Sequence, residues 1–216
     1  MIARSNEKHI QMAANDAGTL FTARSRIHPA HTNIYHQGDA VSGFYRVNSG
    51  VVMVYRLLEN SQRQISGFFT HGEFFGLSAD DIYHDSAITV STASVTKLSM
   101  ADVSRCPELQ EQLFRTTCSQ LADAQTLITA LTKKSASEKI AYFLVSLAQR
   151  QHRDGNDIDI RLPMSRRDIA DYLGLTIETV SRRLTALKSE GVISLPNRDT
   201  VHINRFDDLQ AMAGAQ

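Results

Sequence analysis

Four side chains near the C-terminal end of the chain have the chemistry and the spacing to contact nucleic-acid bases. They are Glu178, Ser181, Arg182 and Thr185, at positions i, i+3, i+4 and i+7, which share one face of a helix. Arginine can bond O6 and N7 of guanine together, glutamate can accept from the amino group of cytosine, and serine can bond a base edge. Three of the four lie in the first two turns, so the pattern predicts base reading by Glu178, Ser181 and Arg182.

The same stretch carries an apolar stripe, and burial of this stripe in the core would leave the polar face exposed. The stripe repeats at i, i+3, i+7 and i+10 and consists of Ile177, Val180, Leu184 and Leu187. Glu178 lies four residues before Arg182, so we also expect its carboxylate to hold the guanidinium by a charge-assisted hydrogen bond.

A shorter helix is predicted immediately before it. Ser165 followed by Asp168 is close to a capping box, so Ser165 should begin this helix. Gly174 suits the left-handed residue that ends it, and Thr176 should cap the next helix. Two short helices joined by a tight glycine turn form a helix-turn-helix. Side chains around this motif are predicted to bond to the DNA backbone: Ser165, Arg166, Arg167, Thr176, Thr179 and Arg183.

Two strands should follow the helix pair as a wing. Residues 192–195 and 200–203 are strand-like, and 196–199 form the turn between them. The alternative is an unrelated helical pair in which Glu178 and Arg182 form an ordinary surface ion pair. Cap, turn, apolar stripe and wing all favour the DNA-binding interpretation.

The distribution of charge agrees with a C-terminal DNA site. The net charge of the whole chain is zero, which by itself argues weakly against a nucleic-acid binder. However, residues 1–132 hold 10 basic and 12 acidic side chains, whereas residues 133–216 hold 13 and 11. The basic excess therefore lies in the half that carries the predicted motif.

The N-terminal part of the chain reads as short strands. Turn signals such as Gly38-Asp39 and His71-Gly72 separate short apolar runs, which predicts a small barrel or roll rather than alternating strands and helices. The predicted strands cover residues 43–47, 51–58, 64–69, 87–91 and 94–100.

A helical pattern begins at residue 101. No glycine or proline interrupts residues 108–153, a length too great for one ordinary helix, so we expect a break at 133–137 with Ser135 or Ser137 as the cap. A turn at 154–156 and a strand at 157–162 should follow. This divides the chain into a sensor or effector domain at 1–105, a dimerisation helix at 106–132 and a DNA-binding domain at 133–216.

The first long helix has an apolar stripe, and no other predicted element is assigned to pack against it. It could pack on its own barrel, or it could pair with the same helix of a second chain, and the two are compatible if different flanks are used. The residues predicted to form the dimer seam are Leu113, Leu121, Ile128 and Leu131.

Residues 162–182, LPMSRRDIADYLGLTIETVSR, resemble the DNA-binding signature of the CRP/FNR family in its FNR/FixK branch. Gly38-Asp39, residues 47–50 and residues 72–76 fall where that family has its β-roll glycines. The resemblance implies an α+β fold: an N-terminal β-roll like the cyclic-nucleotide-binding jelly roll, a long dimerisation helix and a C-terminal winged helix-turn-helix.

The resemblance also implies a function. A homodimer would bind double-stranded DNA at a TTGAT-type palindrome through Glu178, Ser181 and Arg182. It would act mainly as an activator, in a low-oxygen or nitrogen-oxide response. An acidic loop would contact RNA polymerase, and the comparable residues here are Asp80, Asp81 and Asp85, near Tyr83. The alternative for this loop is a solvated turn.

This sequence lacks the residues that bind the cofactors known in the family. The only cysteines are Cys106 and Cys118, so the N-terminal cysteines of an iron–sulfur cluster are missing. An Arg-Ser pair that would bind a cyclic phosphate is replaced by Asp85-Ser86, and the carboxylate would repel the ligand. We therefore predict a FixK-like regulator without a cofactor. The alternative within the family is a sensor gated by haem or another small effector.

A metal-dependent enzyme fused to a DNA-binding domain is the competing class. No His-x-His pair and no nucleophile–base set supports it, so no enzymatic activity is predicted. Residues 1–16 lack the apolar block of a secretory signal, and no stretch is apolar enough to span a membrane. The expected location is the cytoplasm, with no membrane partner.

Overall fold

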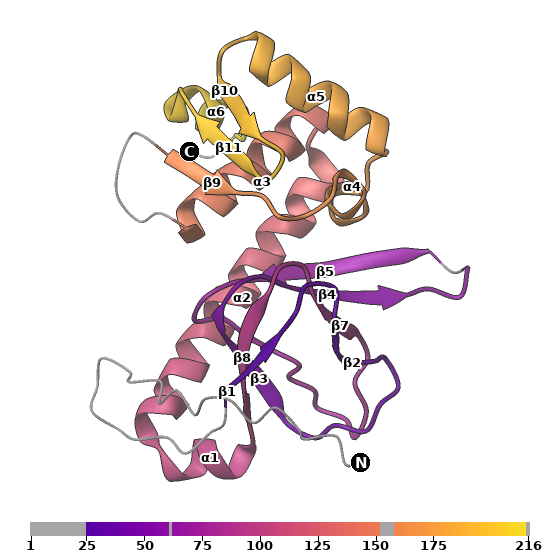
Figure 1. Cartoon of the computed structure of the whole chain (residues 1–216), viewed down its shortest axis with the longest axis vertical. Coiled ribbons are helices and arrows are strands. Elements are labelled where there is room, and N and C mark those ends of the chain that lie inside the picture. Colours follow the sequence, from indigo (N-terminus) through magenta and orange to yellow (C-terminus); the bar gives the residue numbers. More distant parts are fainter. Residues whose placement is uncertain (1–24, 61, 152–157, 215–216) are drawn as a thin grey trace, which may run out of the picture.

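The computed structural model describes residues 25–60, 62–151 and 158–214. The N-terminal residues 1–16 and the turn predicted at 154–156 lie outside this part of the chain. Within it, a β-roll, a long helix and a smaller α/β domain follow one another along the chain (Figure 1). The α+β architecture predicted from the sequence is confirmed.

The β-roll consists of two antiparallel four-stranded sheets. Their strand orders are β1-β8-β3-β6 and β2-β7-β4-β5. The strands are β1 (Ser25–His28), β2 (Asn33–Tyr35), β3 (Phe44–Ser49), β4 (Val52–Leu57), β5 (Arg63–Phe69), β6 (Phe74–Phe75), β7 (Ser86–Thr89) and β8 (Ala93–Leu98). The five predicted strands correspond to β3, β4, β5, β7 and β8, whereas the short strands β1, β2 and β6 were not predicted.

Aromatic side chains fill the space between the two sheets. Tyr35 stacks on Tyr83 with ring centroids 3.9 Å apart, and Tyr45 stacks on Phe75 at 5.3 Å. All four rings are buried, and the Tyr83 hydroxyl donates a hydrogen bond to the carbonyl of Gly43. Tyr83 is therefore a core residue, although the sequence suggested that it lies in an exposed polar loop.

Three helices lead away from the β-roll. They are α1 (Met100–Arg105), α2 (Pro107–Lys133) and α3 (Ala136–Gln151). The predicted break is confirmed, because only Lys134 and Ser135 separate α2 from α3. Ser135 caps α3: its backbone N–H donates to the Glu138 carboxylate at 2.7 Å, and its Oγ accepts from the Glu138 N–H at 3.4 Å.

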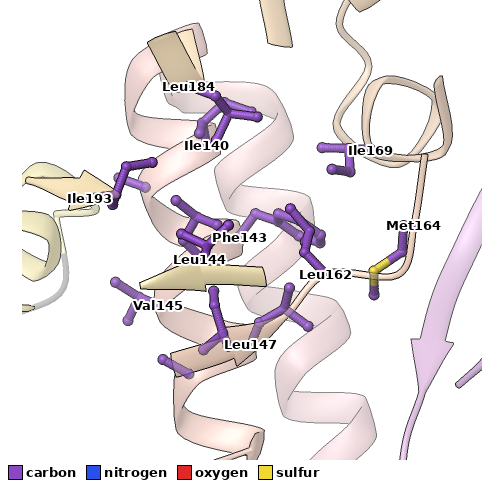
Figure 2. Close-up of a cluster of buried hydrophobic side chains, with 14 of the residues drawn as sticks. Ile140, Phe143, Leu144, Val145, Leu147, Leu162, Met164, Ile169, Leu184 and Ile193 are labelled. Atoms are coloured by element: carbon purple, nitrogen blue, oxygen red, sulfur yellow. The ribbon is translucent and has the colours of Figure 1, made fainter. Parts of the chain in front are cut away.

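The C-terminal domain is built around α3. Helices α4 (Arg166–Leu173), α5 (Ile177–Ser189) and α6 (Phe206–Met212) surround it, with a small sheet of β9 (Ile158–Arg161), β10 (Ile193–Asn197) and β11 (Thr200–Ile203) in the order β10-β11-β9. Buried side chains from α3 meet those of the other elements in one core, among them Ile140, Phe143, Leu144, Leu162, Ile169, Leu184 and Ile193 (Figure 2).

The two domains are in direct contact. Phe68 of β5 packs edge-on against Phe143 of α3 and Tyr172 of α4, with ring centroids 6.2 and 5.3 Å apart. Arg150 of α3 donates to the Phe68 carbonyl at 3.2 Å and pairs with Asp123 of α2 at 3.1 Å. These contacts place the β4–β5 hairpin beneath α4 (Figure 1). No described helix has the length and apolar character needed to cross a bilayer.

Candidate nucleic-acid interface

Helix α4 begins with a complete capping box. Ser165 Oγ accepts from the Asp168 N–H at 3.1 Å, while Asp168 Oδ2 accepts from the Ser165 N–H at 2.9 Å and from its Oγ at 2.7 Å. The helix ends at Gly174, whose φ of 60° lies in the left-handed region that favours glycine. Both termini predicted from the sequence are confirmed, and this short turn orients the next helix.

Helix α5 presents the predicted reading face to solvent. Thr176 caps it by accepting from the Thr179 N–H at 3.2 Å, and the apolar stripe lies against the core, with Val180, Leu184 and Leu187 buried and Ile177 half-buried. Glu178, Ser181 and Arg182 are all exposed. The structure therefore brings the three predicted base-reading residues together on one accessible surface.

The expected hydrogen bond between Glu178 and Arg182 does not form. A bond from its own backbone N–H and one involving Thr176 hold the pKa of Glu178 below its usual value, with a smaller contribution from the charge of Arg182. The carboxylate thus turns to the helix N-terminus, where unpaired N–H groups attract it. Among the described residues Arg182 has no hydrogen-bond or ion-pair partner, so its guanidinium is free to bond to another molecule.

The residues predicted to contact phosphates differ in accessibility. Ser165, Arg167, Thr176 and Arg183 are exposed and Thr179 is half-buried. Arg166 is also half-buried: its Nη1 is enclosed without a hydrogen-bond partner in the described chain, and burial lowers the pKa of its guanidinium. It lies in the wall of a cleft of about 1420 Å³ between the β-roll and the C-terminal domain. Of the arginines at the start of α4, Arg167 is therefore the more accessible to a phosphate.

The wing lies beside the helix pair as predicted. Strands β10 and β11 pair antiparallel, with Ile193 opposite Ile203 and Asn197 opposite Thr200. Strand β9 pairs with the other edge of β11 and anchors the wing to the chain that leads into α4. The helix-turn-helix and the wing thus belong to one packed domain.

Helix α2 carries an exposed apolar row. Phe114, Leu121 and Ile128 recur at every seventh residue and are 69, 61 and 61 % exposed. Leu131 is half-buried near the end of the helix. Leu113, which the sequence assigned to the dimer seam, instead packs against its own β-roll beside Phe44, Phe74 and Leu98. Phe114 was missed, although the spacing of seven residues could have identified it.

The acidic loop predicted to contact polymerase is partly engaged within the β-roll. Asp85 pairs with Arg56 at 3.0 Å, and Asp80 pairs with His84. Asp81 is exposed, while the neighbouring Tyr83 points into the core. A contact with polymerase would therefore involve the carboxylates and not the aromatic ring.

Outside the helix-turn-helix, the side chains of the described part of the chain that could form a metal or thiol site are its His, Cys, Asp and Glu residues. Among the described residues, no group of three or more His, Cys, Asp and Glu side chains is arranged to hold a metal ion. Cys106 is buried, with its Sγ accepting from the Leu109 N–H at 3.4 Å, and Cys118 is exposed on α2.

Comparisons with known proteins agree with this architecture. The Crp-like helix-turn-helix domain matches residues 138–212, and the cyclic nucleotide-binding domain matches residues 25–108. The nitrogen fixation regulation protein FixK of Rhizobium meliloti is 40 % identical over 182 residues, covering 83 % of this chain and 82 % of FixK. The transcriptional activator protein Anr of Pseudomonas aeruginosa is 36 % identical over 190 residues, covering 85 % of this chain and 78 % of Anr. The structure of FixK2 from Bradyrhizobium japonicum superimposes with a TM-score of 0.80 at 28 % identity, covering 91 % of this chain and all of FixK2.

Proposed function

Since the chain belongs to the CRP/FNR family of transcription regulators, we propose that it binds a TTGAT-type palindrome as a homodimer and regulates transcription in the manner of the FNR/FixK branch. The observation that carries this proposal is the exposed face of Glu178, Ser181 and Arg182 on α5. No described residue forms a hydrogen bond or ion pair with the guanidinium of Arg182. Members of this family are regulators and not enzymes.

Arg182 is the main determinant of sequence in this proposal. Its planar fork bonds to O6 and N7 of the guanine in each half-site, while Glu178 accepts from a cytosine amino group and Ser181 contacts a base edge. Exposed Arg167 and Arg183, with the caps Ser165 and Thr176 and the neighbouring Thr179, bond to phosphates and hold the register. Half-buried Arg166 joins them if its side chain turns toward DNA.

Dimerisation supplies the second half-site. The row of Phe114, Leu121 and Ile128 would pair with the same row of a second chain, and Leu131 would extend the seam. A two-fold dimer presents two copies of α5, which matches the two-fold symmetry of a palindrome.

We further propose that DNA binding requires no cofactor. By the resemblance to the family, Asp85 stands where an arginine would bind a cyclic phosphate. The Tyr35–Tyr83 stack also occupies space between the two sheets. The protein purified in air should therefore bind its DNA site without added ligand. Strict dependence on cyclic AMP or on haem would instead support the alternative of a ligand-gated sensor.

Activation through polymerase is the last part of the proposal. Anr, which is similar over most of this chain, is named a transcriptional activator. By analogy, the acidic loop with Asp80, Asp81 and Asp85 would contact RNA polymerase when the dimer is bound upstream of a promoter.

The decisive experiment measures the affinity of Arg182→Ala for a TTGAT…ATCAA duplex and for a duplex with each guanine replaced. One bidentate pair contributes about 1–3 kcal/mol of discrimination, so a dimer should lose about 2–6 kcal/mol and its preference for guanine. Arg182→Lys should restore little, because an ammonium cannot form the two parallel bonds. Full retention of the guanine preference by Arg182→Ala would refute the assigned reading face.

A further inference from the structure

Arg63 of β5 reaches from the β-roll into the helix-turn-helix. Its Nη2 donates to Asp168 Oδ1 at 2.6 Å and to Asp171 Oδ2 at 2.8 Å, and its Nε donates to the same Asp171 oxygen at 3.1 Å. The three side chains are only 25, 15 and 29 % exposed. One guanidinium therefore holds two carboxylates of α4 in a partly sheltered site, where charge-assisted bonds are stronger than on an open surface.

Asp168 links this contact to the start of α4. Its Oδ1 binds Arg63, and its Oδ2 completes the capping box with Ser165. Arg166 and Arg167 lie between Ser165 and Asp168 in the chain. Both carboxylate oxygens of Asp168 therefore hold the first turn of α4, which carries the proposed phosphate contacts. One oxygen is bound within the turn, and the other is bound by Arg63 of the N-terminal domain.

The contact also neutralises negative charge near the proposed DNA surface. Without Arg63, the carboxylates of Asp168 and Asp171 would stand uncompensated on the helix that is expected to approach phosphates, and like charges repel there. A second contact also joins the two domains, because Phe68 of β5 packs on Phe143 and Tyr172.

We propose that Arg63 is a positioning residue for DNA binding: it orients the first turn of α4 and neutralises Asp168 and Asp171, so that the β4–β5 hairpin sets how firmly the helix-turn-helix holds DNA. This inference rests on the proposed DNA-binding function and leaves the identity of the DNA sequence open. A residue of the N-terminal domain would thereby influence the affinity of the C-terminal domain for DNA.

The first test compares Arg63→Ala with Arg56→Ala. Arg56 is a matched control, because it lies on β4 of the same hairpin and pairs with Asp85 inside the β-roll. At fixed salt, Arg63→Ala should weaken binding to the TTGAT…ATCAA duplex on the order of 5- to 30-fold, the lower part of the range usual for coupling between sites. Arg56→Ala should bind like the wild type. Unchanged or tighter binding by Arg63→Ala would overturn the proposal.

A second test separates positioning from direct contact with DNA. Asp171→Asn removes one of the carboxylates that Arg63 neutralises, so it should improve binding more in the Arg63→Ala background than in the wild type. If Arg63 bonded directly to a phosphate, Asp171→Asn would change both backgrounds equally, and Arg63→Ala would lower the salt slope by about one. That result would also overturn the proposal.

A third measurement needs no DNA. Hydrogen exchange at the amides of Asp168 and Ile169, which are bonded to Ser165, should be faster in Arg63→Ala than in the wild type and Arg56→Ala. Equal exchange in all three proteins would refute the positioning role. If the wild type fails to bind the TTGAT duplex, the proposed sequence preference is wrong, and the exchange rates still decide the role of Arg63.

Discussion

Replacing Leu121 by aspartate should dissociate the proposed dimer. Leu121 lies midway along the apolar row of α2, seven residues from both Phe114 and Ile128. In a pair of α2 helices each side chain of the row would face its counterpart and lose its contact with water. An aspartate at this position would put two unpaired carboxylates into the centre of the seam.

The magnitude follows from the exposure of the three side chains. Complete burial of a Leu, Ile or Phe side chain contributes about 1.5–3 kcal/mol. Because roughly two-thirds of each is exposed in the single chain, pairing should contribute about 1–2 kcal/mol per side chain, or about 6–12 kcal/mol for the six in a dimer. Leu121→Asp removes two of these contributions, about 2–4 kcal/mol, which alone raises the dimer dissociation constant about 30- to 1000-fold.

Sedimentation velocity over a concentration series would measure this change. Ser119→Asp is the matched control, since it adds the same charge at an exposed position of α2 that lies away from the row. The control should remain dimeric, whereas Leu121→Asp should sediment as a monomer and lose specific DNA binding. An unchanged dissociation constant for Leu121→Asp would place the interface elsewhere on the molecule.

Two further predictions concern the surface charges. Arg167→Ala should weaken binding to all DNA sequences alike and lower the salt slope by about one, as measured by titration at several salt concentrations; a loss confined to the specific site would contradict its role as a phosphate contact. Charge reversal at Asp80, Asp81 and Asp85 should reduce transcription in vitro while DNA affinity stays constant, and unchanged transcription would remove this loop from the proposed polymerase contact.

The helix-turn-helix could be predicted because its signals are local. Ser165 and Asp168 are three residues apart, and Gly174 closes the same helix, so nearest neighbours along the chain specify both ends. The short strand β6, only Phe74 and Phe75, has no such signal. Phe74 packs on Phe44, and Phe75 stacks on Tyr45, both about 30 residues away in the sequence, so no local pattern indicates this strand.

Other differences between expectation and structure have the same origin. Leu113 and Phe114 are adjacent, and which of them faces the β-roll depends on how α2 is rotated against Phe44 and Phe74. Tyr83 lies in a polar stretch of sequence, yet its ring stacks on Tyr35 in the core. The Arg63–Asp168 contact spans 105 residues of sequence, so composition and spacing could not indicate it.

The two-residue joint between α2 and α3 has a consequence for the promoters that such a dimer could use. Lys134 is fixed on both sides, with its N–H bonded to the Ala130 carbonyl at 3.1 Å and its Nζ to the carbonyl of Ala213. Inserting one base pair between two half-sites turns one of them by about 34° and moves it by about 3.4 Å. Because the joint is short and anchored on both sides, the DNA-binding domain has little freedom to rotate and shift toward the displaced half-site. In the proposed dimer, this joint would therefore fix the distance between the two copies of α5, and a promoter would need half-sites at that spacing as well as the right base sequence.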